Sequence, residues 1–77
     1  MIAPTNLTPG AYRGLSGPDR YLVGLKADEA IFVAVGPGPT GAPVTLSTLQ
    51  ACSRAAFAHW AVAKIEAPAP AGLPQPA

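Results

Sequence analysis

Charged side chains are scarce in this sequence. Only 12% of the 77 residues are charged, and five basic residues against four acidic ones leave a formal net charge of +1. Globular chains carry about 25% charged residues, and phosphate binding needs clustered Lys and Arg. The basic residues are scattered among the acids, which argues against a strongly electrostatic nucleic-acid binder and equally against a highly acidic nucleic-acid mimic.

Cysteines and unbroken apolar runs are also few. Cys52 is the single cysteine, so no disulfide can form within the chain, and a lone thiol fits the cytosol. The longest uncharged run, 30–53, is interrupted by prolines and glycines, which excludes a membrane-spanning helix there. Residues 1–10 hold two prolines and no basic residue, so we expect no signal peptide and a cytoplasmic or virion-associated protein.

Small and conformationally special residues dominate what is present. Sixteen Ala, eight Gly and ten Pro fill 34 of the 77 positions, whereas Leu, Ile, Val and Phe together total 17. That aliphatic and Phe content lies just above the level at which chains stay disordered. A domain of this length buries only about 60% of its unfolded surface, so we expect the chain to gain stability by docking onto something.

Proline divides the chain into three parts. Residues 1–10 contain Pro4 and Pro9, and residues 67–77 contain four prolines, so both segments favour extended backbone over helix. We interpret them as N- and C-terminal arms on either side of a single compact domain at 11–66. Leu7 and Leu73 are the apolar anchors of the two arms, which we expect to bind protein, either a second copy of this chain or a larger protein assembly.

The compact region begins with strand patterns. Short strands are predicted at 11–15 and 44–46, and stronger ones at 21–26 and 30–35, where β-branched and aromatic residues gather. The short polar connection between the two stronger strands predicts an antiparallel hairpin. The run Gly36-Pro37-Gly38-Pro39-Thr40-Gly41 matches a dinucleotide-binding spacing, but its prolines lack the N–H donors that a pyrophosphate needs, so we interpret it as a rigid turn.

A helix is predicted over the Ala-rich stretch that follows. Ser47 with Gln50 fits a capping box, and Pro68 forbids continuation beyond about residue 67. Trp60 should then pack against the sheet with Phe32 or Val33, Leu49 and Ala56. The fold class predicted is α+β: a three- or four-stranded antiparallel sheet with one C-terminal helix, for which a partly open, SH3-like barrel is the nearest simple architecture.

Residues with catalytic or ligating chemistry do not combine into a site. Cys52 and His59 would lie about 10 Å apart along a helix, too far for a thiol–imidazole dyad, and no third metal ligand accompanies them. We interpret Cys52 as a buried small residue and His59 as a helix-edge or interface residue. Asp28 and Glu29 fit a solvated hairpin turn. We therefore expect no enzymatic activity, no cofactor and no metal.

The remaining hypotheses concern binding. The leading one is a structural or interaction protein that docks through its arms and an apolar helix onto a larger assembly, for example as a virion decoration or accessory protein. One alternative is a small phage or bacterial regulator that inhibits a protein complex. A second is a weak single-stranded nucleic-acid binder that uses Tyr12-Arg13 and Arg20-Tyr21. The candidate partner-binding residues are Leu7, Pro9, Tyr12, Arg13, Arg20, Tyr21, His59, Val62, Ile65 and Leu73.

Overall fold

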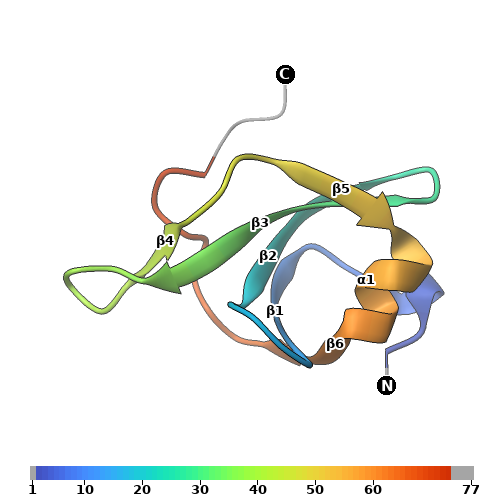
Figure 1. Ribbon diagram of the computed structural model, residues 1–77, viewed down its shortest axis with the longest axis horizontal. Coiled ribbons are helices and arrows are strands. Elements are labelled where there is room, and N and C mark those ends of the chain that lie inside the picture. The colour runs from blue at the N-terminus through green and yellow to red at the C-terminus, as the bar shows by residue number, and fades with distance from the viewer. Residues whose placement is uncertain (1, 74–77) are drawn as a thin grey trace.

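The computed structural model describes residues 2–73 and shows a small α+β fold that is mostly sheet (Figure 1). One α-helix accompanies six strands in the described chain. In chain order the elements are a 3-10 turn η1 (Pro4–Asn6), β1 (Gly10–Gly14), β2 (Arg20–Lys26), β3 (Glu29–Pro37), β4 (Pro43–Thr45), β5 (Gln50–Ser53), α1 (Arg54–Trp60) and β6 (Ala61–Ile65).

The six strands form one antiparallel sheet that does not close on itself. Its order is β4-β3-β2-β1-β6, and β5 pairs with the first half of β3 while β4 pairs with its end. The predicted hairpin is confirmed, because β2 and β3 pair antiparallel from Arg20↔Ala34 to Lys26↔Glu29. The expected count of three or four strands was wrong, since β5 and β6 extend the sheet at its two edges.

The long helix predicted from residue 47 to 67 was also wrong. The α-helix spans only Arg54–Trp60, and the residues on either side of it are strands that pair with β3 and β1. The hydroxyl of Ser53, not Ser47, caps the helix by accepting the Ala56 N–H at 3.0 Å. Ser47 Oγ instead accepts the Ala34 N–H at 2.9 Å. Pairing at the sheet edges has therefore overridden the helix propensity of the alanines.

Aromatic side chains form the centre of the core. The Phe57 ring of α1 lies 5.4 Å from Tyr12, 5.5 Å from Phe32 and 5.4 Å from Trp60, measured between ring centroids. Trp60 is 9% exposed and belongs to this cluster with Phe32, which confirms that part of the prediction. Leu49 was wrongly expected there, because it is 36% exposed.

The N-terminal segment folds onto its own domain. Leu7 is 3% exposed and belongs to the main core cluster, while η1 lies against α1. The Tyr12 hydroxyl donates to Thr8 O at 2.8 Å and accepts the Thr8 N–H at 3.1 Å, which fixes the turn into β1. The described part of the expected N-terminal arm is thus packed against the same chain.

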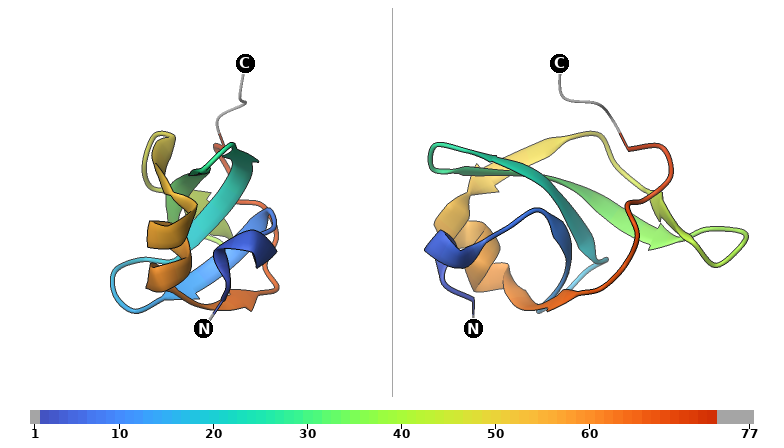
Figure 2. Two further views of the ribbon diagram at one scale, coloured as in Figure 1. Left: turned by 90° about the vertical axis from the view of Figure 1, so that its right-hand side faces the viewer. Right: turned by 180° about the vertical axis from the view of Figure 1, so that it is seen from behind.

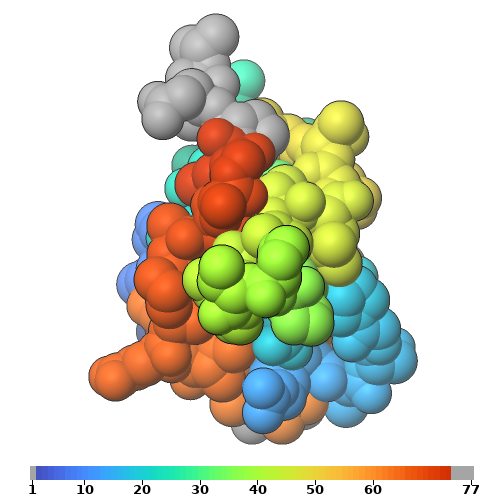
Figure 3. All heavy atoms as spheres, turned by 90° about the vertical axis from the view of Figure 1, so that its left-hand side faces the viewer, coloured from blue at the N-terminus to red at the C-terminus, as the bar shows by residue number. Residues whose placement is uncertain are grey.

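The C-terminal segment also returns to its own sheet. We call residues 66–73 the strap, since they lead from β6 across to β4 at the opposite end of the sheet order (Figure 2). Ala71 forms a parallel bridge with Val44, Pro70 is buried and Leu73 is half-buried. The space-filling view shows the strap lying against the segment between β3 and β4 (Figure 3). The last four positions of the expected arm, 74–77, lie outside the described residues.

Candidate functional site

Two of the predicted partner-binding residues are not available at the surface. Leu7 is 3% exposed and Tyr12 is 1% exposed, and both belong to the main core cluster. Their burial follows from the N-terminal turn, which places Leu7 on the core and positions the Tyr12 hydroxyl at the backbone of Thr8. These two side chains stabilise the fold and cannot reach a partner without unfolding it.

Arg20 is used within the fold in a different way. Its guanidinium carbon lies 4.6 Å from the centroid of the Phe32 ring and 4.1 Å from that of Trp60. Such cation–π contacts contribute on the order of 0.5–2 kcal/mol each, depending on how far the cation is desolvated. Arg20 thus covers one end of the aromatic core, a role that its position beside Tyr21 in the sequence did not indicate.

The four residues proposed for nucleic-acid stacking do not share a surface. Tyr12 is buried, and Arg20 is stacked on the core aromatics. Arg13 is 67% exposed at its side chain and pairs with Asp19 at 3.5 Å, while Tyr21 is half-buried. Base stacking needs exposed aromatic faces beside a basic track, and this arrangement does not provide one.

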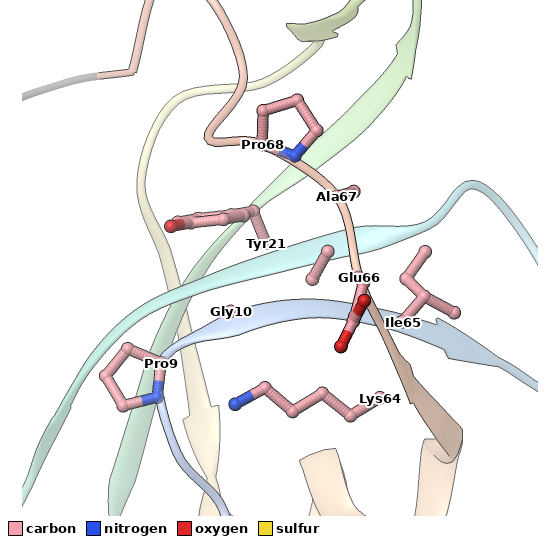
Figure 4. Close-up of a pocket in the computed structure, with 9 residues that line it drawn as sticks. Pro9, Gly10, Tyr21, Lys64, Ile65, Glu66, Ala67 and Pro68 are labelled. Carbon is pink, nitrogen blue, oxygen red and sulfur yellow. The ribbon is translucent and has the colours of Figure 1, made fainter.

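An open groove brings three other predicted residues together. Pro9, Tyr21 and Ile65 line a hollow of about 800 Å³ between the start of β1 and the end of β6 (Figure 4). Strand register explains why Tyr21 and Ile65 meet. Ala11 of β1 pairs with Tyr21 on one side and with Ile65 on the other, so the side chains of Ala11, Tyr21 and Ile65 lie on the same face of the sheet.

Charged residues that the sequence analysis missed complete this groove. Lys64 and Glu66 line it together with Pro68 of the strap. The Lys64 ammonium donates to Thr8 Oγ1 at 2.6 Å, and its side chain crosses Gly10, where a Cβ would meet Lys64 Cε at 2.7 Å. Figure 4 shows Tyr21 and Pro68 on one side of β1 and Lys64 on the other.

A second surface, around the start of β6, places two exposed apolar side chains beside His59 and the buried Ala61. We call Leu15, His59, Ala61 and Val62 the β6 patch; they line a hollow of about 260 Å³. Leu15 is 67% exposed and Val62 is 53% exposed. The Leu15 N–H donates to Trp60 O at 2.9 Å, which holds the β1–β2 turn against the end of α1. His59 and Val62 were predicted binding residues, whereas Leu15 was not.

Cys52 and His59 are placed on different elements, β5 and α1. Burial raises the pKa of the Cys52 thiol above its ordinary value, although the positive charge of Arg20 and a hydrogen bond with the Phe57 backbone oppose that effect. Among residues 2–73, no three His, Cys, Asp or Glu side chains gather as a metal site. The run at 36–41 turns from β3 into β4, and Gly38 N–H donates to Ala42 O at 2.8 Å.

No protein-family model, curated protein or solved structure matches this chain. None of the helices in the described residues has the length and apolar character needed to cross a membrane.

Proposed function

We propose that this chain is a non-enzymatic interaction protein that docks onto a larger protein assembly through the β6 patch. The observation that carries the proposal is the exposure of two large apolar side chains side by side, Leu15 at 67% and Val62 at 53%. Burying apolar surface contributes about 25 cal/mol per Å². Burying these two side chains against a partner protein would therefore contribute favourably to the free energy of binding.

The strand edge next to the patch supports docking of an extended segment. β6 stands at the end of the sheet order, and within the described chain its strand pairing is with β1 alone. Edge strands present unpaired N–H and C=O groups, and natural edges often carry a lysine that blocks pairing. The ammonium of Lys64 is engaged with Thr8 Oγ1 instead, and the exposed Ala63 of β6 lets another backbone approach closely.

The partner chemistry follows from the lining of the patch. Leu15, Ala61 and Val62 are apolar, and His59 is the one titratable side chain among the four. A matching protein segment would be extended, would place aliphatic or aromatic side chains over Leu15 and Val62, and would offer a carboxylate to His59. An accessory subunit of a larger assembly, such as a virion decoration protein, is the class of protein to which we assign this chain.

This proposal changes the expected route of docking. The apolar face of α1 supports docking less well than expected, because Phe57, Ala58 and Trp60 are turned inward. The fold is proposed to be a partly open barrel of the SH3-like kind, a description that the place of β6 beside β1, directly after α1, supports.

Size-exclusion chromatography of native cell extracts tests the proposal. The tagged chain, produced in its own cellular source, should elute at the mass of a large complex. Val62→Lys should elute no larger than a dimer of the 7.7 kDa chain. Leu49→Lys is the matched control, since Leu49 is an exposed leucine that precedes β5 at the opposite edge of the sheet. Identical elution of the wild-type chain and Val62→Lys would contradict the proposal.

A further inference from the structure

The strap is anchored at its far end by the backbone of β4. Ala71 N–H donates to Pro43 O at 3.0 Å, and Thr45 N–H donates to Ala71 O at 2.9 Å. These two hydrogen bonds form the parallel bridge between Val44 and Ala71, next to the buried Pro70. We call the β4 edge at 43–45 the strap seat. The strap seat binds the extended strap through these two backbone hydrogen bonds.

The part of the strap before Pro70 is more exposed than the anchored end. Residues 66–69 are all exposed, and they include Pro68. Ala67 lines the same hollow as Val35 and Pro43, so the strap contributes one wall of that hollow. Proline keeps this connection stiff and extended, which limits the ways in which it can relax while both of its ends stay attached.

The length of the strap leaves limited slack. β6 and β4 are four strand spacings apart in the sheet order, which is about 19 Å along the sheet at roughly 4.8 Å per spacing. The six steps from Ile65 to Ala71 reach about 19 Å in polyproline II geometry. The sheet is coiled, so the direct line is somewhat shorter, but a segment two residues shorter would reach only about 12 Å.

One polar group makes opening of the strap less costly. Thr45 Oγ1 is buried without a hydrogen-bond partner in the described chain. An unsatisfied buried hydroxyl costs on the order of 1–3 kcal/mol. Gly72 of the strap lies against Thr45, since a Cβ at Gly72 would be 4.0 Å from Thr45 Cβ. Departure of the strap therefore lets water approach this hydroxyl, which offsets part of the energy of the two lost backbone hydrogen bonds.

We propose that the strap of one copy occupies the strap seat of a second copy, so that the chain forms reciprocal strap-exchanged dimers. The seat is left with an unpaired β4 edge and an open apolar wall at Val35 whenever its own strap departs. The strap of a second copy satisfies that seat with the same contacts, because the two sequences are identical. Short connections with little slack favour such exchange.

Changing the strap length tests the exchange in the full chain. Deleting residues 67–68 removes the reach needed for the closed form, so the shortened chain should have the molar mass of a dimer at concentrations where the wild-type chain of 7.7 kDa is still a monomer. Inserting two glycines after Ala67 adds slack and should keep the chain monomeric. The wild-type mass should rise from monomer toward dimer between about 5 and 500 µM, as mass action requires. Equal molar masses for all three chains would overturn the proposal.

Disulfide trapping identifies the contact itself. In chains that carry Cys52→Ser, tagged Val44→Cys copies are mixed with untagged Ala71→Cys copies and then oxidised. Each chain carries only one of the two cysteines, so residues 44 and 71 can form a disulfide only between two copies. Strap exchange brings these residues together, so disulfide-linked dimers of one Val44→Cys chain and one Ala71→Cys chain should outnumber dimers of two identical chains. The glycine insertion should abolish that excess, and Trp60 fluorescence checks that each chain is folded. A statistical mixture of dimers would refute the exchange.

The exchange and the β6 patch can fail separately. Val62→Lys changes the patch but not the strap seat, so trapping between the Val44→Cys and Ala71→Cys chains should continue in its presence. If Val62→Lys instead removed the mixed dimers, the dimer would be formed by the β6 patch and the strap proposal would be wrong.

Discussion

Replacing Gly14 by alanine should destabilise the fold severely, because the indole of Trp60 lies directly over this glycine. A Cβ at residue 14 would overlap the ring atoms Cε2, Cδ2 and Cζ2 of Trp60, well inside the roughly 3.5–4.0 Å of ordinary carbon contacts. The ring would have to move away from Arg20 and from Ser16, whose carbonyl accepts the indole N–H at 2.9 Å.

The expected loss can be estimated from these contacts. Overpacking of this kind costs about 1–3 kcal/mol, and the displaced hydrogen bond about 0.5–1.5 kcal/mol. We therefore expect Gly14→Ala to lower the free energy of unfolding by about 2–4 kcal/mol, most of the roughly 3–5 kcal/mol that a core of this size supplies. Gly24→Ala is the matched control, since a Cβ there meets nothing within 4 Å. It should change stability by less than about 1 kcal/mol, and in the stabilising direction.

Urea unfolding followed by fluorescence measures both variants, because Trp60 is the single tryptophan. Gly14→Ala should unfold at a much lower urea concentration, and its folded state should emit at longer wavelength. Equal midpoints for Gly14→Ala and Gly24→Ala would show that the indole does not rest on Gly14.

Three further predictions concern single side chains. Arg20→Met should lower stability by about 1–2 kcal/mol through loss of the cation–π contacts and shift Trp60 emission; unchanged stability would contradict the stacking. Because burial raises the pKa of Cys52, alkylation at pH 8 should be slower than for free cysteine and should increase as the pH rises further; a faster reaction would contradict it. Binding to single-stranded DNA should be undetectable at micromolar protein and about 0.15 M salt; a complex weakened by Arg13→Ala would reverse that expectation.

Local patterns in the sequence were sufficient to predict the central hairpin. β2 and β3 contain several β-branched and aromatic residues, including Tyr21, Val33 and Phe32, and a short polar turn joins the two strands, so these local signals favour the same structure. The small α+β class was predicted from that hairpin and a C-terminal helix, although the helix is much shorter than expected. The hairpin could be predicted from residues that are close together in the sequence, without knowledge of any long-range contact.

The sheet edges could not be predicted in this way. The alanines around β6 favour a helix locally, and the strand forms because β1, about fifty residues earlier, pairs with it. Val62 and Ile65, which are β-branched, were the available signal for a strand there. Ser53 is likewise a good N-cap three residues before Ala56, but the Ser47–Gln50 spacing competed with it.

The candidate surfaces were predicted only in part for the same reason. Tyr21 and Ile65 meet because each pairs with Ala11, a relation that depends on strand register and not on sequence spacing. Leu15 looked like an ordinary strand residue, and its exposure results from the turn that holds it against the end of α1. Tyr12 and Arg20, which looked like surface residues, were drawn into the aromatic core.

Position-specific cross-linking at Val62 tests the proposed docking most directly. A photoreactive amino acid replaces Val62 in the full chain, within the cell that produces it, and a second chain carries the same group in place of Leu49. If the β6 patch docks onto a protein assembly, the label at residue 62 should give one discrete adduct to another protein, and Leu15→Lys should abolish it. No adduct at residue 62, or an equal adduct from residue 49, would contradict the account.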